Sequence, residues 1–396
     1  MFESLQMAPP DPILGLNEAF KKDPNAGKIN LSIGVYKDAA GHTPILDSVK
    51  AAETRMLEQE TTKGYLDIHG SRDFAAATVE LLFGRGDSGV SSERVATAQT
   101  PGGTGALRVA AEYLKTIHPQ TSVYVSGPSW PIHPKIFKAA GLDVGTYPYF
   151  DQKNHGLAYP NMIETLEKIP TGSVVVLHGC CHNPTGVEIE ADQWKRIGAL
   201  LANRHIIPLV DFAYQGFATG IQEDAEGLRI LTQYCDELFI CSSYSKNFAL
   251  YNERVGALTI LAREPAHAQH VLSHVKSCIR ATYSNPPAHG AAIVSTIIGD
   301  AQLKQQWEQE LARMRDRINS MRHLFVETTR QRGLDADFSF VTRQKGMFSL
   351  TGLSAEQIDT LRHKHAVYIV GNSRLNVAGM TEENIPRLVD TIASVL

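Results

Sequence analysis

The sequence predicts an α/β fold in which helices cover a mostly parallel sheet. Through the middle of the chain, short β-branched runs alternate with amphipathic stretches, a pattern typical of strand–helix–strand units. The length of 396 residues is too great for one compact core and indicates two domains, or one large domain with an appendage. The expected strands are residues 95–99, 122–125, 173–178, 206–210 and 238–241, and the expected helices include 104–117 and 192–204.

A long amphipathic helix is expected from residue 303, because apolar residues recur there at steps of three and four. They are Leu303, Trp307, Leu311, Met314, Ile318, Met321 and Phe325. A coiled coil is the alternative, but this stripe makes only about three heptads, so a helix linking two domains is favoured.

The two ends of the chain are expected to form a smaller α/β unit. Residues 347–350, 368–370 and 375–377 resemble short strands, and the first 45 residues, rich in Pro and Gly, are expected to pack with them. The predicted division is 1–45 as an N-terminal arm and part of the small domain, 46–305 as a large domain, and 306–396 as linking helix and C-terminal small domain.

Composition argues against several classes of protein. A hydrophobic share of 43% and a charged share of 20% are ordinary for a globular protein. The net charge of −4, without a basic face, argues against nucleic acid or an anionic membrane as a partner. No apolar run approaches the ~20 residues that span a bilayer, and the start lacks a secretion signal. Five cysteines without C-x-x-C spacing indicate a reducing cytoplasm.

Candidate site residues follow the expected strands, because ligands of open parallel sheets lie beyond the carboxyl ends of the strands. A glycine-rich turn at 100–105 opens a helix and can present backbone N–H groups to a phosphate. Trp130, Asn183 and Asp211 follow the next three strands. Each has a structural alternative, such as a core plug for Trp130 or a helix cap for Asp211, but their coincidence favours a shared site.

Lys246 follows the fifth expected strand and is the most informative candidate. It comes directly after Ser243 and Ser245, with Arg254 eight positions later. The hydroxyls and the guanidinium suit a phosphate, and the amine suits an aldehyde. The combination predicts a lysine that holds pyridoxal phosphate.

A metal site is the alternative interpretation of the cluster His178, Cys180, Cys181 and His182. Adjacent strand residues face opposite ways, and structural zinc pairs usually have two to four residues between ligands. Metal binding is therefore not expected.

Ordered motifs along the whole chain resemble the aspartate/aromatic aminotransferase family of pyridoxal-phosphate enzymes, and most of all its bacterial aspartate aminotransferases. The matching stretches are residues 11–16 (DPILGL), 32–37 (SIGVYK), 99–108 (QTPGGTGALR), 182–186 (HNPTG), 211–217 (DFAYQGF), 242–248 (SSYSKNF), 283–287 (YSNPP) and 373–379 (SRLNVAG). The resemblance implies fold type I, with a seven-stranded sheet in the cofactor-binding large domain, and an obligate homodimer.

The resemblance also implies a role for each candidate residue. Lys246 bonds covalently to the cofactor, Asp211 pairs with its pyridine nitrogen, and Trp130 stacks on its ring. Asn183 and Tyr214 hydrogen-bond its phenolic oxygen. The phosphate ligands are Gly103, Thr104, Ser243, Ser245, Arg254 and, from a second subunit, Tyr65. The substrate ligands are Arg374 beside Gly34 for the α-carboxylate, and Arg280 of the other subunit for the distal carboxylate. His133 and His178 line the same region and are expected to be hydrogen-bonded structural histidines.

Two arginine forks favour dicarboxylic substrates, so L-aspartate and 2-oxoglutarate are expected. Val35, Lys37, Thr43, Thr104 and Asn285 resemble the aspartate branch of the family. Gly64 and Ile132 depart from it, because asparagine is common at both positions, and their lack of polar groups leaves aromatic amino acids as possible substrates.

Three other functions compete with this interpretation. Decarboxylation or elimination on the same fold is disfavoured by the arginine pair. A non-catalytic, aminotransferase-like sensor would need an N-terminal DNA-binding module, whereas the resemblance starts at about residue 2. A NAD- or nucleotide-dependent enzyme is disfavoured because neither phosphate-loop spacing occurs.

Overall fold

The computed structural model describes residues 2–7, 11, 13–84 and 89–396, so Pro12 of the stretch 11–16 lies outside the described residues. Its contacts divide the chain into two compact units. The sheet unit comprises Pro44–Asn183 and Val187–Asp316, and the terminal unit comprises Met1–Thr43, Pro184–Gly186 and Arg317–Leu396. Over the described ranges, no helix has both the length and the apolar character needed to cross a membrane.

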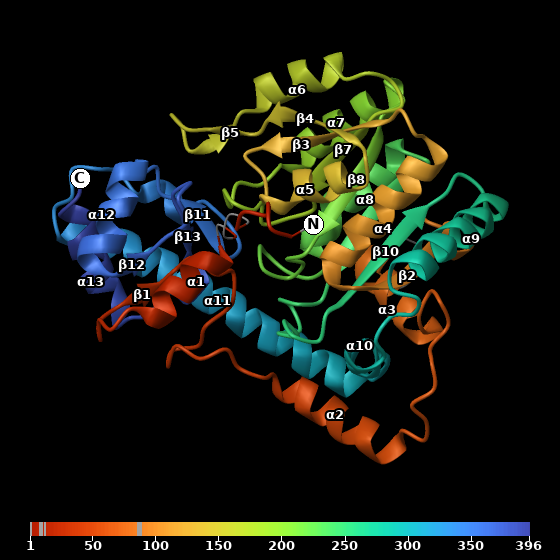
Figure 1. The fold of residues 1–396 in the computed structure, drawn as a ribbon, viewed down its shortest axis with the longest axis horizontal. Coiled ribbons are helices and arrows are strands. Elements are labelled where there is room, and N and C mark those ends of the chain that lie inside the picture. The colour runs from red at the N-terminus through yellow and green to blue at the C-terminus, as the bar shows by residue number, and fades with distance from the viewer. Residues whose placement is uncertain (1, 8–10, 12, 85–88) are drawn as a thin grey trace. The chain divides into compact units, whose positions relative to one another are not determined.

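The sheet unit contains a seven-stranded, mostly parallel sheet, as predicted (Figure 1). In spatial order its strands are β2 (Val95–Pro101), β10 (Val255–Leu261), β9 (Leu238–Ser243), β8 (Ile207–Phe212), β7 (Val174–His178), β3 (Ser122–Gly127) and β4 (Asp143–Pro148). Only β10 runs antiparallel to its neighbours. All five expected strands are present.

Two strands of this sheet were not predicted from the sequence. The edge strand β4 has the sequence DVGTYP, whose glycine and proline weaken a strand pattern. The strand β10 is buried at every position, so its apolar run lacks the alternation that marks a half-buried strand.

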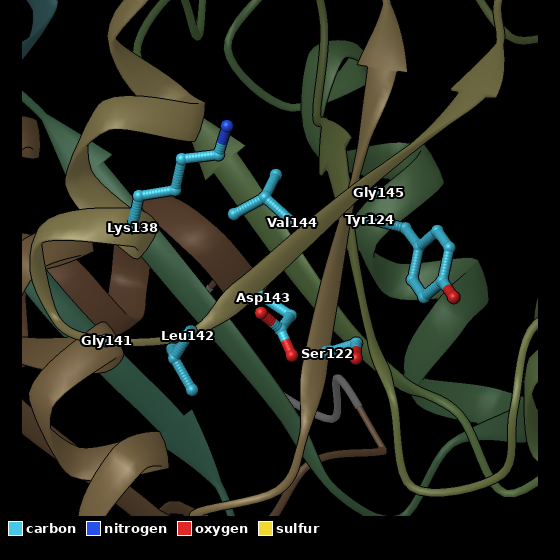
Figure 2. A pocket seen from close by; sticks show the side chains of 8 residues that line it. All are labelled: Ser122, Tyr124, Lys138, Gly141, Leu142, Asp143, Val144 and Gly145. Atoms are coloured by element: carbon cyan, nitrogen blue, oxygen red, sulfur yellow. The ribbon is translucent and has the colours of Figure 1, made fainter.

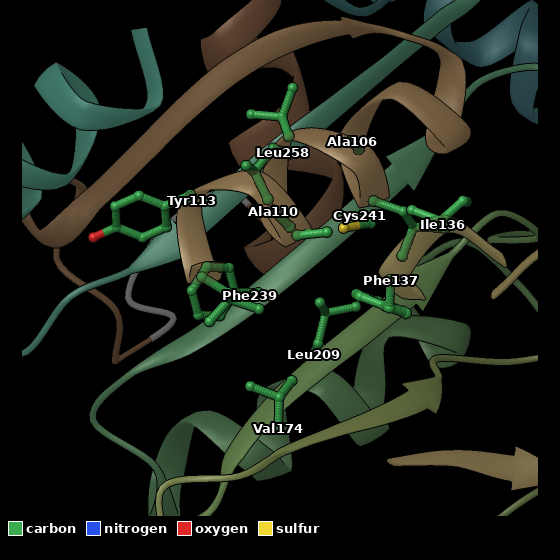
Figure 3. Close-up of a cluster of buried hydrophobic side chains, with 14 of the residues drawn as sticks. Ala106, Ala110, Tyr113, Ile136, Phe137, Val174, Leu209, Phe239, Cys241 and Leu258 are labelled. Carbon is green, nitrogen blue, oxygen red and sulfur yellow. The ribbon is translucent and has the colours of Figure 1, made fainter. Parts of the chain in front are cut away.

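One face of the sheet packs against α4 (Gly102–Ile117), α5 (Ile132–Ala139) and α9 (Pro265–Thr282). Figure 3 shows this cluster, where Ala110 of α4 and Phe137 of α5 meet Leu209 of β8 and Phe239 of β9. Val174 and Val176 belong to the cluster, while the intervening Val175 is buried on the opposite face, as the two-residue period of a strand requires.

The other elements of the sheet unit are short strands and helices around this core. They are α2 (Asp47–Gln59), α3 (Arg72–Phe83), β5 (Phe150–Asp151), β6 (Gly156–Leu157), α6 (Tyr159–Lys168), α7 (Ala191–Asn203), α8 (Glu226–Tyr234) and α10 (His289–Gly299). The expected helices 104–117 and 192–204 are α4 and α7.

The terminal unit joins both ends of the chain. Its elements are α1 (Leu14–Lys22), β1 (Ile29–Asn30), β11 (Phe348–Leu350), α12 (Ala355–His365), β12 (Val367–Tyr368), β13 (Arg374–Asn376) and α13 (Asn384–Ala393). The strand β1 pairs in parallel with β12, and β11 pairs antiparallel with β13. The latter pairing sets Arg374 opposite Leu350.

The predicted long helix is α11 (Ala301–Gln331), and the boundary between the units falls within it, after Asp316. All members of its apolar stripe, from Leu303 to Phe325, are buried within the single chain. A stripe already buried in this way leaves no apolar seam for a coiled-coil partner, which supports the interpretation favoured from the sequence.

Candidate active site

The site residues of the sheet unit gather at one edge of the sheet because of its topology. Strands β2, β9, β8, β7 and β3 run in the same direction, so their carboxyl ends lie together. At that edge Asp211 is in register with His178 on one side and with Cys241 on the other. The antiparallel β10 starts where its neighbours end, which brings the preceding residue, Arg254, to the same edge.

An anion cradle forms where α4 begins. Gly103 and Thr104 lie in the first turn of α4, and no side chain caps this helix start. Gly102 has a φ of +74°, and a Cβ there would lie 2.5 Å from Nη2 of Arg254. A Cβ on Gly103 would lie 3.1 Å from Cβ of Ser243. The glycines therefore keep open the space between a positive helix end and the Arg254 guanidinium.

The two serines that precede Lys246 line the same cradle. Nη1 of Arg254 donates to Oγ of Ser245 at 3.2 Å, and the backbone N–H of Ser245 donates to Oγ of Ser243 at 3.4 Å. Free helix N–H groups, two hydroxyls and a guanidinium are the donors that bind a phosphate ester.

Asp211, in β8, is buried with 7% of its surface exposed. Its Oδ2 lies 2.7 Å from Nε2 of His133, whose Nδ1 lies 2.8 Å from Oγ of Ser129. Burial raises the pKa of Asp211, but the hydrogen bond from His133 and nearby positive charge, including Lys246, outweigh burial and leave this pKa below its ordinary value. An ionised Asp211 can only accept, so Nε2 of His133 donates and its Nδ1 accepts from Ser129 when the ring is neutral.

His178 is the other imidazole beside Asp211, and it differs from His133. Burial, with the charge of His133, lowers the pKa of His178 to about 3, so its ring is neutral at pH 7. Neither ring nitrogen of His178 has a hydrogen-bond partner among the described residues. The expectation of a hydrogen-bonded histidine is thus confirmed for His133, whereas His178 makes no hydrogen bond to the described residues. A buried polar group without a partner at this edge is a feature of a ligand site.

Lys246 and Tyr214 complete the edge. Lys246 is half-buried just after β9, and its Nζ lies 4.9 Å from the ring centroid of Tyr214, which is buried. Asn183 follows β7 and is also buried, and the half-buried Trp130 packs edge-on against His133, with ring centroids 5.3 Å apart. An amine, a phenol, a carboxylate and an aromatic ring therefore share one place with the anion cradle.

Two clusters in the described part of the chain have the spacing of metal ligands. One consists of His133, His178 and Asp211, in which His133 already donates to Asp211. The other consists of Cys180, Cys181 and Asp224. Each Asp224 oxygen accepts two backbone N–H groups of residues 216–220, so this carboxylate organises the loop after Tyr214.

A separate hollow of about 560 Å³ lies along the edge strand β4 (Figure 2). Ser122 and Asp143, which line it, are the first residues of β3 and β4. The hollow therefore includes the amino ends of these strands, opposite the edge that carries Lys246.

Comparison with known proteins shows the family of the chain. The model of class I and II aminotransferases matches residues 26–392. The chain belongs to the class I and II aminotransferases. It is 52% identical over 396 residues to the aspartate aminotransferase of Escherichia coli, with 100% of both chains covered. It is 46% identical over 394 residues to an aromatic-amino-acid aminotransferase of Pseudomonas aeruginosa, covering 100% of this chain and 98% of the relative.

A solved structure shares the fold of this aminotransferase. The aromatic-amino-acid aminotransferase of Burkholderia pseudomallei, described as covalently bound to pyridoxal phosphate, matches with a TM-score of 0.97 and 42% identity. The match covers 100% of this chain and 99% of that one.

In the terminal unit of this aminotransferase, Arg374 and Gly34 meet through Phe348. Arg374 is 3% exposed, and its Nη2 donates to the carbonyl oxygen of Ser32 at 2.6 Å. Its guanidinium carbon lies 4.2 Å from the centroid of the Phe348 ring. A Cβ on Gly34 would lie 2.5 Å from Cζ of the same ring. Sequence reasoning missed Phe348, because this residue reaches Arg374 through the pairing of β11 with β13, which no local sequence pattern encodes.

Tyr65 and Arg280 are not enclosed with the residues around Lys246 in a single chain of the aminotransferase. Tyr65 lies between α2 and α3 with 96% of its surface exposed. Arg280 is exposed in the last turn of α9, where it donates to Oγ of Ser284. Both side chains are accessible to another molecule.

Proposed function

We propose that this protein is a pyridoxal-phosphate-dependent aminotransferase that moves an amino group between L-aspartate and 2-oxoglutarate by a ping-pong mechanism. The observation that carries the proposal is that Lys246, Asp211 and the anion cradle lie at one edge of the sheet. Relatives named aspartate aminotransferases, about half identical over the full chain, support the reaction. The neighbour bound to pyridoxal phosphate supports the cofactor.

The residues of the sheet unit fit this cofactor group by group. Gly103, Thr104, Ser243, Ser245 and Arg254 would hold the phosphate. Lys246 would bond to the aldehyde, Asp211 would hold the ring nitrogen, and Trp130 would cover the ring. Asn183 and Tyr214 would hydrogen-bond the phenolic oxygen. His133, through its bond to Asp211, would fix the carboxylate in place.

The chemistry divides between cofactor and protein. Pyridoxal phosphate supplies an aldehyde and a conjugated ring that accepts the electron pair left when an amino acid loses its α-proton. Asp211, ionised in its buried position, would keep a proton on the ring nitrogen. The Lys246 amine would act as general base and then as general acid, taking the proton from the substrate α-carbon and delivering it to the carbon that the cofactor's aldehyde supplies. Tyr214, under the Lys246 amine, limits where that amine can reach.

Substrate selection is assigned to two arginines. Arg374, beside Gly34, would bind the α-carboxylate as a planar fork, and Arg280 of a second subunit would bind the distal carboxylate. An aromatic-amino-acid aminotransferase is the second candidate, because Ile132 packs against the apolar core instead of presenting a polar group, and Gly64 has no side chain. Aspartate remains favoured because of the arginine pair.

A homodimer would complete the site. The Tyr65 ring is almost wholly exposed, as are the apolar side chains of Met7 and Leu57. In the dimer we propose, Tyr65 would reach the phosphate in the partner's site, and Arg280 would reach the partner's substrate.

The enzyme would act in the cytoplasm, where its free thiols stay reduced.

An amino-transfer assay on aspartate and phenylalanine tests this function. The wild-type enzyme is expected to transfer the amino group of aspartate to 2-oxoglutarate with a higher kcat/KM than that of phenylalanine. Arg280→Asp is expected to lower kcat/KM for aspartate by at least roughly a hundredfold, since a like charge replaces the fork, and to raise it for arginine. An unchanged preference for aspartate over arginine would show that Arg280 is misassigned.

A further inference from the structure

A fully buried arginine in α11, Arg322, has no place in the mechanism above. It belongs to the terminal unit and is 1% exposed. Its Nη1 donates to the carbonyl oxygen of Val341 at 3.0 Å and to Oγ of Ser349 at 2.6 Å. Its Nη2 donates to the carbonyl oxygens of Gly346 at 2.7 Å and Phe348 at 2.8 Å. A buried cation is costly unless it is well hydrogen-bonded, and here Nη1 and Nη2 each donate to two acceptors.

The acceptors of Arg322 fix the course of residues 341–349. Gly186 also lies against this segment, and its Cβ position is 2.5 Å from the carbonyl oxygen of Phe348. The carbonyl oxygen of Gly186 accepts the N–H of Lys345 at 2.7 Å. The Phe348 backbone is therefore confined by the Arg322 fork and by a glycine that leaves no room for a side chain.

The Phe348 ring contacts Arg374, so the position of residue 348 affects the position of the guanidinium. The Arg374 guanidinium lies over the ring, 4.2 Å from its centroid, and the Gly34 backbone approaches the Cζ tip of the ring too closely for a Cβ. The carbonyl of Ser32 holds the same guanidinium at 2.6 Å. The ring is therefore a surface on which the Arg374 guanidinium packs, and a shift of the ring is expected to shift the guanidinium.

We infer that Arg322 is a positioning residue for substrate binding, which sets the Arg374 fork through Phe348. This inference rests on the proposed function, which assigns Arg374 to the substrate α-carboxylate. A lysine at position 322 cannot replace the guanidinium, since one ammonium cannot bridge two pairs of acceptors in a plane. Loss of the Arg322 guanidinium is expected to weaken binding of the substrate carboxylate. It is expected to leave the groups around Lys246, which belong to the other unit, in place.

The test is steady-state kinetics of the holoenzyme with Arg322→Lys and Ser349→Ala. Arg322→Lys is expected to raise KM for both aspartate and 2-oxoglutarate by roughly ten- to a hundredfold, with kcat changed by only a few-fold. Ser349→Ala removes one acceptor and is expected to shift KM in the same direction by less. The matched control is Arg387→Lys, because Arg387 also donates to a backbone carbonyl, that of His365, but touches neither Phe348 nor its segment.

The outcomes separate positioning from a merely structural role. A lower Tm with unchanged KM in Arg322→Lys would mean that Arg322 only stabilises the unit, and would overturn the inference. If Arg322→Lys does not fold, Ser349→Ala decides, and an unchanged KM in that variant overturns it equally. Wild-type enzyme that transfers no amino group would refute the proposed function itself, whereas an active wild type with insensitive variants refutes only the role of Arg322.

Discussion

Lys246→Ala protein is expected to be colourless and to lose more than about 10⁴-fold in amino-transfer rate, because one amine both anchors the cofactor and moves the substrate proton. The half-buried amine lies over the Tyr214 ring, just beyond the end of β9. Visible absorbance of the purified protein and a single-turnover assay with aspartate measure the two losses separately.

The control for this variant is Lys138→Ala. Lys138 is an exposed lysine of α5 that lines the hollow beside β4. Removing it is expected to leave colour and rate unchanged. Lys246→Ala protein that keeps both its yellow colour and its turnover would mean that another lysine is the anchor.

Asp211→Asn protein is expected to retain bound cofactor but to lose most of its activity. A nearby opposite charge moves a pKa by ~1–3 units, about 1.4–4 kcal/mol, so loss of the carboxylate is expected to slow proton removal by roughly ten- to a thousandfold. The amide preserves the size of the side chain and can still contact His133. Cofactor content, measured after denaturation, and kcat for aspartate give the two readouts.

Asp143→Asn is the matched control for Asp211→Asn, because Asp143 is an exposed carboxylate at the opposite end of the sheet strands. It is expected to keep both cofactor and rate. Near-normal turnover of Asp211→Asn would show that Asp211 does not hold the ring nitrogen.

The sequence predicted the edge of the sheet well because the signals there are local. Asn183, Asp211 and Lys246 are separated by 28 and 35 residues, about one strand–helix unit each, so parallel strands had to bring them together. The structure confirms that β7, β8 and β9 are neighbours and that these residues lie at or just beyond their carboxyl ends.

Other parts of the site depend on contacts that no local pattern encodes. The reversed direction of β10 brings Arg254 to the cradle, and the bond between His133 and Asp211 joins residues 78 positions apart. Phe348 reaches Arg374 only because β11 pairs with β13. The proposed roles of Tyr65 and Arg280 depend on a second copy of the chain, so neither a single sequence nor a single chain decides them.

Borohydride reduction of the holoenzyme, followed by peptide mapping, tests whether the cofactor is attached covalently to Lys246. Reduction makes the attachment permanent, and we expect one pyridoxyl-modified peptide, with the added mass on the nitrogen of residue 246. Modification of a different lysine, or of none, would show that Lys246 does not hold the cofactor.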